Sequence, residues 1–212
     1  MEQRALKRSY PSMRQGERGS FGGSQNWFAD RTMQRCGCGV VACADVLLYL
    51  KGQSDLSRDE YLRYAASIRR YFPLIPGHGI DGLRLAWGLN RCLQKAGLPY
   101  RARWSASGKR FWERLTEMLG NDLPVILSIG PNFPRIWGKQ KLRLFRRTED
   151  GAYVLAESTR AHFVTVTGYD GEWLEISSWG RRLYISRQEY EQYMRGDSTA
   201  VLSNLMYLKR TG

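Results

Sequence analysis

Histidine, acidic residues and long apolar stretches are all scarce in this sequence. Its 212 residues include only two histidines and four cysteines, and no Cys-x-x-Cys pair occurs, so we expect no metal site. No stretch approaches the roughly 20 apolar residues that cross a bilayer, and residues 1–23 lack the apolar centre of a secretory signal peptide. We therefore expect a cytoplasmic protein with no membrane span.

Several short functional motifs are missing as well. There is no Walker phosphate loop and no dinucleotide-binding fingerprint, so we expect no cofactor. The absence of Gly-x-Ser-x-Gly argues against a serine hydrolase. The remaining candidates for chemistry are the cysteines and the two histidines.

The shortage of acidic residues makes the chain strongly basic. It has 33 Lys and Arg against 20 Asp and Glu, a formal net charge of +13. Such a charge suits nucleic acid or another polyanion. The positive residues are spread along the whole chain and no basic block reaches five residues, which favours a solvated basic surface. A nucleic-acid partner stays as the alternative, and Phe133–Lys141 fits either such a contact or a mobile loop beside a substrate.

The hydrophobic pattern changes from helical to strand-like along the chain. Residues 1–24 are rich in Arg, Gly, Ser and Gln and predict a flexible basic arm, followed by a single domain over residues 25–212. Apolar spacing and end signals predict mostly helices before Pro124 and antiparallel strands after it, which indicates an α+β fold. The expected helices are 39–50, 57–71, 81–96, 109–119 and 186–195, and the expected strands are 100–104, 125–129, 142–147, 153–156, 162–169, 172–178, 183–185 and 201–208.

Cys38 lies where a glycine-containing turn runs into an apolar helix. Gly37–Gly39 precedes the apolar residues 40–50, so we expect the thiol at a helix N-terminus, where free N–H groups and the helix dipole favour a thiolate. Gly39 carries no side chain that would keep a substrate from the sulfur. Asp45 falls two turns later on the same helical face, and we expect a structural carboxylate paired with an arginine.

The other thiols are weaker candidates for the nucleophile. Cys36 is the rival of Cys38, but it belongs to the preceding loop. Cys43 and Cys92 fall inside predicted helices and are expected in the core. Cys36 and Cys38 are too close in sequence to bridge comfortably, so the chain does not resemble a disulfide framework.

A base for the thiol must be one of two histidines. His162 begins a β-branched strand, and a strand can fix the backbone of a histidine while its ring faces a cleft. His78 lies in the loop Pro76–Gly79, which positions a base poorly. We therefore expect His162 to act with Cys38.

The segment from His162 to Gly180 carries a family pattern. His-x-Val-x-x-x-Gly-Tyr at residues 162–169, followed by Ser177-Ser178-Trp179-Gly180, resembles the histidine and asparagine segments of papain-like cysteine peptidases. Cys38-Gly39 and the strand beginning at Leu123 are more similar to the bacterial branch of double-glycine, bacteriocin-processing leader peptidases. The resemblance implies a papain-like fold with a helical half carrying the cysteine and an antiparallel sheet carrying the histidine.

The resemblance also implies roles for further residues. Ser177 occupies the position of the asparagine that orients the imidazole, and Trp179 would shield that contact from water. Gln25 is the candidate for the oxyanion glutamine, with Gln34 as the other choice. The family usually carries that glutamine about six residues before the cysteine, where this chain has Thr32.

The predicted activity is cleavage of a peptide or amide substrate through a thioester on Cys38, with His162 as the base. Transfer of the acyl group to an amine or thiol uses the same geometry and is an alternative. The alternative from another class is an inactive papain-like binding protein that uses its basic surface for an anionic partner. Ser177 in place of asparagine favours that alternative.

Overall fold

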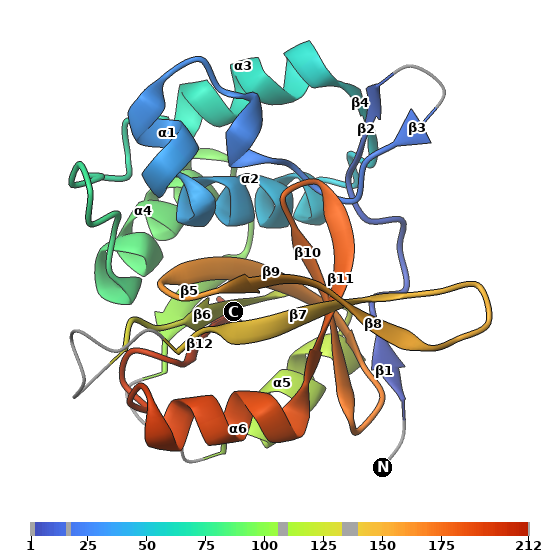
Figure 1. Ribbon diagram of the computed structural model, residues 1–212. Coiled ribbons are helices and arrows are strands. Elements are labelled where there is room, and N and C mark those ends of the chain that lie inside the picture. The colour runs from blue at the N-terminus through green and yellow to red at the C-terminus, as the bar shows by residue number, and fades with distance from the viewer. Residues whose placement is uncertain (1–2, 16–17, 106–109, 133–139, 212) are drawn as a thin grey trace.

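The computed structural model describes residues 3–15, 18–105, 110–132 and 140–211, and its fold is α+β (Figure 1). The helices are α1 Arg31–Cys36, α2 Cys38–Leu50, α3 Arg58–Arg69, α4 Gly82–Lys95, α5 Phe111–Gly120 and α6 Arg187–Gly196, with a 3₁₀ turn, η1, at Gln25–Trp27. The strands are β1 Arg4–Ala5, β2 Ser12–Gln15, β3 Arg18–Gly19, β4 Asp55–Ser57, β5 Tyr100–Trp104, β6 Val125–Ile129, β7 Leu142–Arg147, β8 Tyr153–Thr159, β9 His162–Tyr169, β10 Trp173–Ser178, β11 Arg181–Ser186 and β12 Leu205–Arg210.

The large sheet is antiparallel in all its pairings. Its strands follow the order β5-β12-β6-β9-β10-β11-β7-β8, and β1 adds to the end of β9. Helices α1 to α4 lie on one side of this sheet, and α5 and α6 lie on the other (Figure 1). A small second sheet has the order β3-β2-β4. The α+β class and the large antiparallel sheet agree with the sequence analysis.

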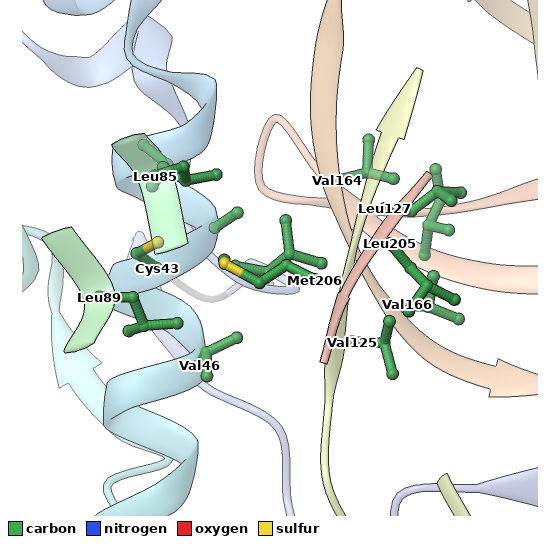
Figure 2. Packing of buried hydrophobic residues seen from close by; sticks show 14 of the residues in the cluster. Cys43, Val46, Leu85, Leu89, Val125, Leu127, Val164, Val166, Leu205 and Met206 are labelled. Atoms are coloured by element: carbon green, nitrogen blue, oxygen red, sulfur yellow. The ribbon is translucent and has the colours of Figure 1, made fainter. Parts of the chain in front are cut away.

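Helix α2 forms the centre of the core. Its residues from Gly39 to Tyr49 are all buried, as expected for a helix that is apolar on every side. Figure 2 shows Cys43 and Val46 of α2, with Leu85 and Leu89 of α4, facing side chains of β6, β9 and β12. The sheet contributes Val125, Leu127, Val164, Val166, Leu205 and Met206 to this contact. The packing holds the first residue of α2, Cys38, beside the start of β9.

Capping, turn and apolar patterns in the sequence correctly predicted a helix start, a hairpin and a buried strand. The Ser57 and Glu60 pair forms the expected capping box at the start of α3. Asp170 and Gly171 form the turn between β9 and β10, which pair as the expected hairpin. Val125–Ile129 is buried along its whole length, as predicted for an apolar strand.

The N-terminal segment differs from the flexible arm expected over residues 1–24. Strand β1 pairs with β9, and β2 pairs in parallel with β4. Met13 is fully buried and Tyr10 is 9% exposed. Local composition predicted disorder because the apolar residues of this segment are few, but each finds a partner far along the chain. The expected division at residue 24 does not coincide with a change in packing.

No helix in the described part of the chain is long and apolar enough to cross a membrane. Of the stretch Phe133–Lys141, residues 133–139 lie outside the described residues, so the expectation of a mobile loop there stays a prediction.

Candidate active site

Cys38 is the first residue of α2, one residue before the predicted start at Gly39, so its thiol lies at a helix N-terminus as expected. Gly37 precedes it as the N-cap, without a side-chain hydrogen bond to the helix. The Cys38 side chain is partly exposed. Burial raises the pKa of its thiol above the usual value, while hydrogen bonds from the backbone N–H groups of Phe163 and Gly39 act in the opposite direction. The contact with Phe163 places the sulfur next to the backbone of the residue that follows His162.

The imidazole of His162 is held at one nitrogen and on one face. The ring Nε2 lies 2.8 Å from the Ser178 hydroxyl, and the Trp179 indole stacks on the imidazole at a centroid distance of 4.4 Å. His162 is 7% exposed, and burial lowers the pKa of its imidazole to about 3. The ring is therefore neutral at physiological pH.

Two residues beside the imidazole have unusual backbone angles. Ala161, which precedes His162, has a φ of 53°, and Trp179 has a φ of 50°. Non-glycine residues adopt this left-handed region rarely, and such residues concentrate at functional sites. Ala161 immediately precedes His162, the first residue of β9, and Trp179 immediately follows β10 and stacks its ring on His162.

Ser177 does not have the position that the sequence analysis expected. Its hydroxyl donates to the carbonyl oxygen of Phe21 at 2.9 Å, and Ser178 contacts the imidazole instead. Neighbouring residues of a strand point to opposite faces, so a shift of one residue changes which serine faces the ring. The register of β10 against β9 shifts between Glu175 and Ile176, which is the kind of irregularity that a pattern of letters does not reveal.

Gln25 lies in the cavity that contains Cys38 and His162. It is 8% exposed and begins η1. Its side-chain amide donates to the carbonyl oxygen of Gln34 at 2.6 Å, whereas the Gln34 side chain is exposed and donates to Phe28. Of the two glutamines considered, Gln25 is the one that lines the cavity.

A single cavity joins the candidate residues from four parts of the chain. Its walls come from Gly23 and the start of η1, from the first two turns of α2, from the start of β9, and from the end of β10 with the residue that follows it. The lining residues are Gly23, Gln25, Cys38, Val41, Ala42, Asp45, His162, Phe163, Ser177, Ser178 and Trp179.

The remaining cysteines and the second histidine lie away from this lining. Cys36, Cys43 and Cys92 are free and buried. His78 is exposed in its loop, where its Nδ1 lies 3.4 Å from the Pro76 carbonyl oxygen. Within the described ranges, no group of three or more His, Cys, Asp or Glu side chains is placed to hold a metal ion.

Asp45 lines the cavity, and its hydrogen-bond partners differ from the arginine that the sequence predicted. It is 2% exposed. The Gly23 backbone N–H donates to both carboxylate oxygens at 3.1 Å, and the Tyr10 hydroxyl donates at 3.3 Å. Burial raises the pKa of Asp45 to about 7, although these hydrogen bonds favour its ionised form. The expected arginine partner is thus replaced by a backbone amide and a tyrosine.

Comparison with known proteins identifies the fold. The chain is similar to the crystal structure of a proposed C39-like peptidase from Bacillus anthracis, with a TM-score of 0.54 and 14% sequence identity over 99% of each chain. No protein-family model and no curated protein matches the sequence. The chain therefore shares the fold of that C39-like structure.

Proposed function

We propose that this chain is a thiol-dependent hydrolase that cleaves peptide or amide bonds through a thioester on Cys38. The observation that supports the proposal is one cavity lined by both the Cys38 thiol at a helix start and the His162 imidazole. Ser178 contacts Nε2 of that imidazole and Trp179 stacks on its ring. A nucleophile, a base and a group that orients the base are the parts that covalent acyl transfer requires.

Protonation states define how the first step proceeds. Burial raises the pKa of the Cys38 thiol and lowers that of the His162 imidazole, so the resting pair is neutral. Ser178 occupies Nε2 of the ring, and Nδ1 is the nitrogen proposed to exchange the proton. The sulfur attacks the substrate carbonyl carbon as His162 takes the thiol proton, and the proton then passes to the leaving amine as the C–N bond breaks.

The second step regenerates the thiol. Water attacks the thioester carbonyl, His162 accepts a proton from that water, and the carboxylic acid leaves as the proton returns to the sulfur. An amine or thiol in place of water would give acyl transfer by the same steps. Trp179, stacked on the ring, keeps water from the contact between His162 and Ser178.

Two donors are proposed for the negative oxygen of the tetrahedral intermediate. The backbone N–H of Cys38 stands at the start of α2, where helix amides have no partner within the helix. The Gln25 amide is the second, and its present bond to the Gln34 carbonyl fixes the direction of the side chain. Removing such a donor typically lowers the rate by on the order of a hundredfold or more.

The substrate is proposed to be a peptide. The short motif Cys38-Gly39 is the feature that favours the leader-peptidase-like branch, whereas the similar structure supports the fold alone. We propose that cleavage takes place in the cytoplasm.

A binding protein without catalysis is the second candidate. The neutral state of both Cys38 and His162 favours it, since papain-like catalysis is usually associated with a more acidic thiol. In that case the net charge of +13 would hold an anionic partner such as nucleic acid.

Labelling with a peptidyl epoxide separates the two candidates. We expect stoichiometric modification of Cys38 at neutral pH, located by mass spectrometry of the digested protein, and loss of labelling in His162→Ala. Cys36→Ala is the matched control and should label as the wild type does. Modification of Cys36 instead, or equal labelling of His162→Ala, would contradict the hydrolase. Salt-sensitive retention on nucleic acid, unchanged in Cys38→Ala, would favour the binding protein.

A further inference from the structure

Asp45 is the buried titratable group at the site for which the proposed reaction has no use. It lies on α2 two turns after Cys38 and lines the same cavity. A Cβ on Gly22 would come within 2.5 Å of its Oδ2 atom and within 2.0 Å of the Ser177 hydroxyl. The Gly22–Gly23 backbone therefore passes between Asp45 and β10 at a distance that only glycine permits, and Gly22 has a φ of 73° that also favours glycine.

Gly23 transmits this contact to the segment that holds the imidazole. Its N–H donates to Asp45, and its carbonyl oxygen accepts from the Gly180 N–H at 2.8 Å. The Phe21 N–H donates in turn to the Gly180 carbonyl oxygen at 2.9 Å. Residues 21–23 thus pair with the turn that places Ser178 and Trp179 on His162.

Gly23 also leads directly to the candidate oxyanion donor. Ser24 caps η1 by accepting from the Asn26 N–H, and Gln25 is the first residue of that turn. A displacement of Gly23 would therefore move Gln25 in the cavity as well as the Trp179–Gly180 turn. The Asp45 carboxylate on α2 therefore accepts a hydrogen bond from Gly23, and Gly23 is connected both to Gln25 and to the Trp179–Gly180 turn.

We propose that Asp45 is a positioning residue, whose ionised carboxylate holds Gly23 and thereby aligns Gln25 and the Ser178–Gly180 turn with Cys38. A hydrogen bond from Gly23 to the charged carboxylate is about twice as strong as one to the neutral acid. Protonation of Asp45 weakens this bond and loosens both connections. The consequence for catalysis rests on the hydrolase function proposed above, whereas the alignment itself does not.

Among the residues that the structure describes, no other group that faces Asp45 changes charge near neutral pH. Tyr10 from the N-terminal segment, Tyr61 from α3 and Cys43 on α2 are its titratable neighbours, and burial raises the pKa of each well above its usual value. Ser177 faces it from β10 and does not titrate. A change centred near pH 7 in this part of the molecule is therefore assigned to Asp45.

Amide NMR signals test the alignment without any substrate. In the full chain between about pH 5.5 and 8.5, we expect the backbone amides of Gly23 and Gly180 and the side-chain amide of Gln25 to shift with one common midpoint near 7. Asp45→Asn should abolish that titration, and the exposed control Asp59→Asn should retain it. Signals that do not titrate, or that titrate equally in Asp45→Asn, would overturn the proposal.

A second variant keeps the test valid if Asp45→Asn fails to fold. Tyr10→Phe removes one donor to the carboxylate and should move the common midpoint to higher pH by about one unit. An unchanged midpoint would count against the proposal.

Epoxide labelling separates this inference from the proposed function. If Cys38 is the nucleophile, Asp45→Asn should slow the chemical step of labelling at least about tenfold with little change in the initial affinity, because the Ser178–Gly180 turn that orients His162 is displaced. Normal labelling of a folded Asp45→Asn would overturn the positioning role. If the wild type is not labelled at all, the hydrolase proposal fails, and the amide titration alone then decides the role of Asp45.

Discussion

The pKa shifts of Asp45 and His162 have opposite directions, so their effects on the pH dependence of the unfolding free energy should cancel in the wild-type protein. The pKa of Asp45 rises from 3.8 to about 7 on folding, and that of His162 falls from 6.5 to about 3, with burial as the main cause of each. At about 1.4 kcal/mol per unit, each shift corresponds to roughly 4–5 kcal/mol across its full pH range.

The two contributions have opposite signs. The stabilisation linked to protonated Asp45 is fully present below pH 3.8 and is lost as the pH rises towards about 7. The stabilisation linked to neutral His162 is fully present above pH 6.5 and is lost as the pH falls towards about 3. Between about pH 4 and 6.5 the two slopes cancel, so these groups together give the wild type a nearly flat profile.

Removing either group should expose the slope of the other. Relative to the wild type, Asp45→Asn should gain about 1.4 kcal/mol of unfolding free energy per pH unit as the pH rises through this window. His162→Gln should lose the same amount per unit, and the double variant should run parallel to the wild type. Urea unfolding followed by tryptophan fluorescence at about pH 4.5, 5.5 and 6.5 measures these differences, provided that the m-value stays constant. Differences from the wild type that do not change with pH in either single variant would refute the reasoning.

Three further changes test individual contacts. Ser178→Ala should slow epoxide labelling of Cys38 about fivefold, the value of one hydrogen bond, and more than Ser177→Ala does, since only Ser178 reaches the imidazole; the opposite order would count against this geometry. Gln25→Ala should lower turnover of a peptide substrate by on the order of a hundredfold, with Gln34→Ala as the control; equal rates would remove Gln25 from the oxyanion site. Met13→Ala should cost about 2–5 kcal/mol in urea unfolding because Met13 is fully buried, whereas a dispensable arm would show no loss.

Much of the fold was accessible from the sequence because its signals are local. The apolar run after Cys38 predicted α2, and the turn residues Asp170 and Gly171 predicted the β9–β10 hairpin. These elements depend on neighbours in sequence, so periodicity and turn chemistry suffice to find them. The cavity shared by Cys38 and His162 follows from how those two elements pack.

The errors arose where distant residues decide the outcome. Residues 1–24 have the composition of a disordered arm, but β1 and β2 are stabilised by pairing with β9 and β4. The assignment of Ser177 to the imidazole depended on the register of one strand pair, and that register shifts between Glu175 and Ile176. The role proposed for Asp45 depends on Gly23, which is 22 residues away in sequence.

Trapping the acyl-enzyme tests the central claim most directly. The protein is mixed with an activated peptide ester, quenched in acid during turnover and examined by intact mass and peptide mapping. We expect an acyl adduct on Cys38 that hydroxylamine removes, and no adduct in His162→Ala. An adduct on another residue, an equal adduct in His162→Ala, or none under conditions where the ester is hydrolysed would contradict the assignment of Cys38 and His162 as the reacting pair.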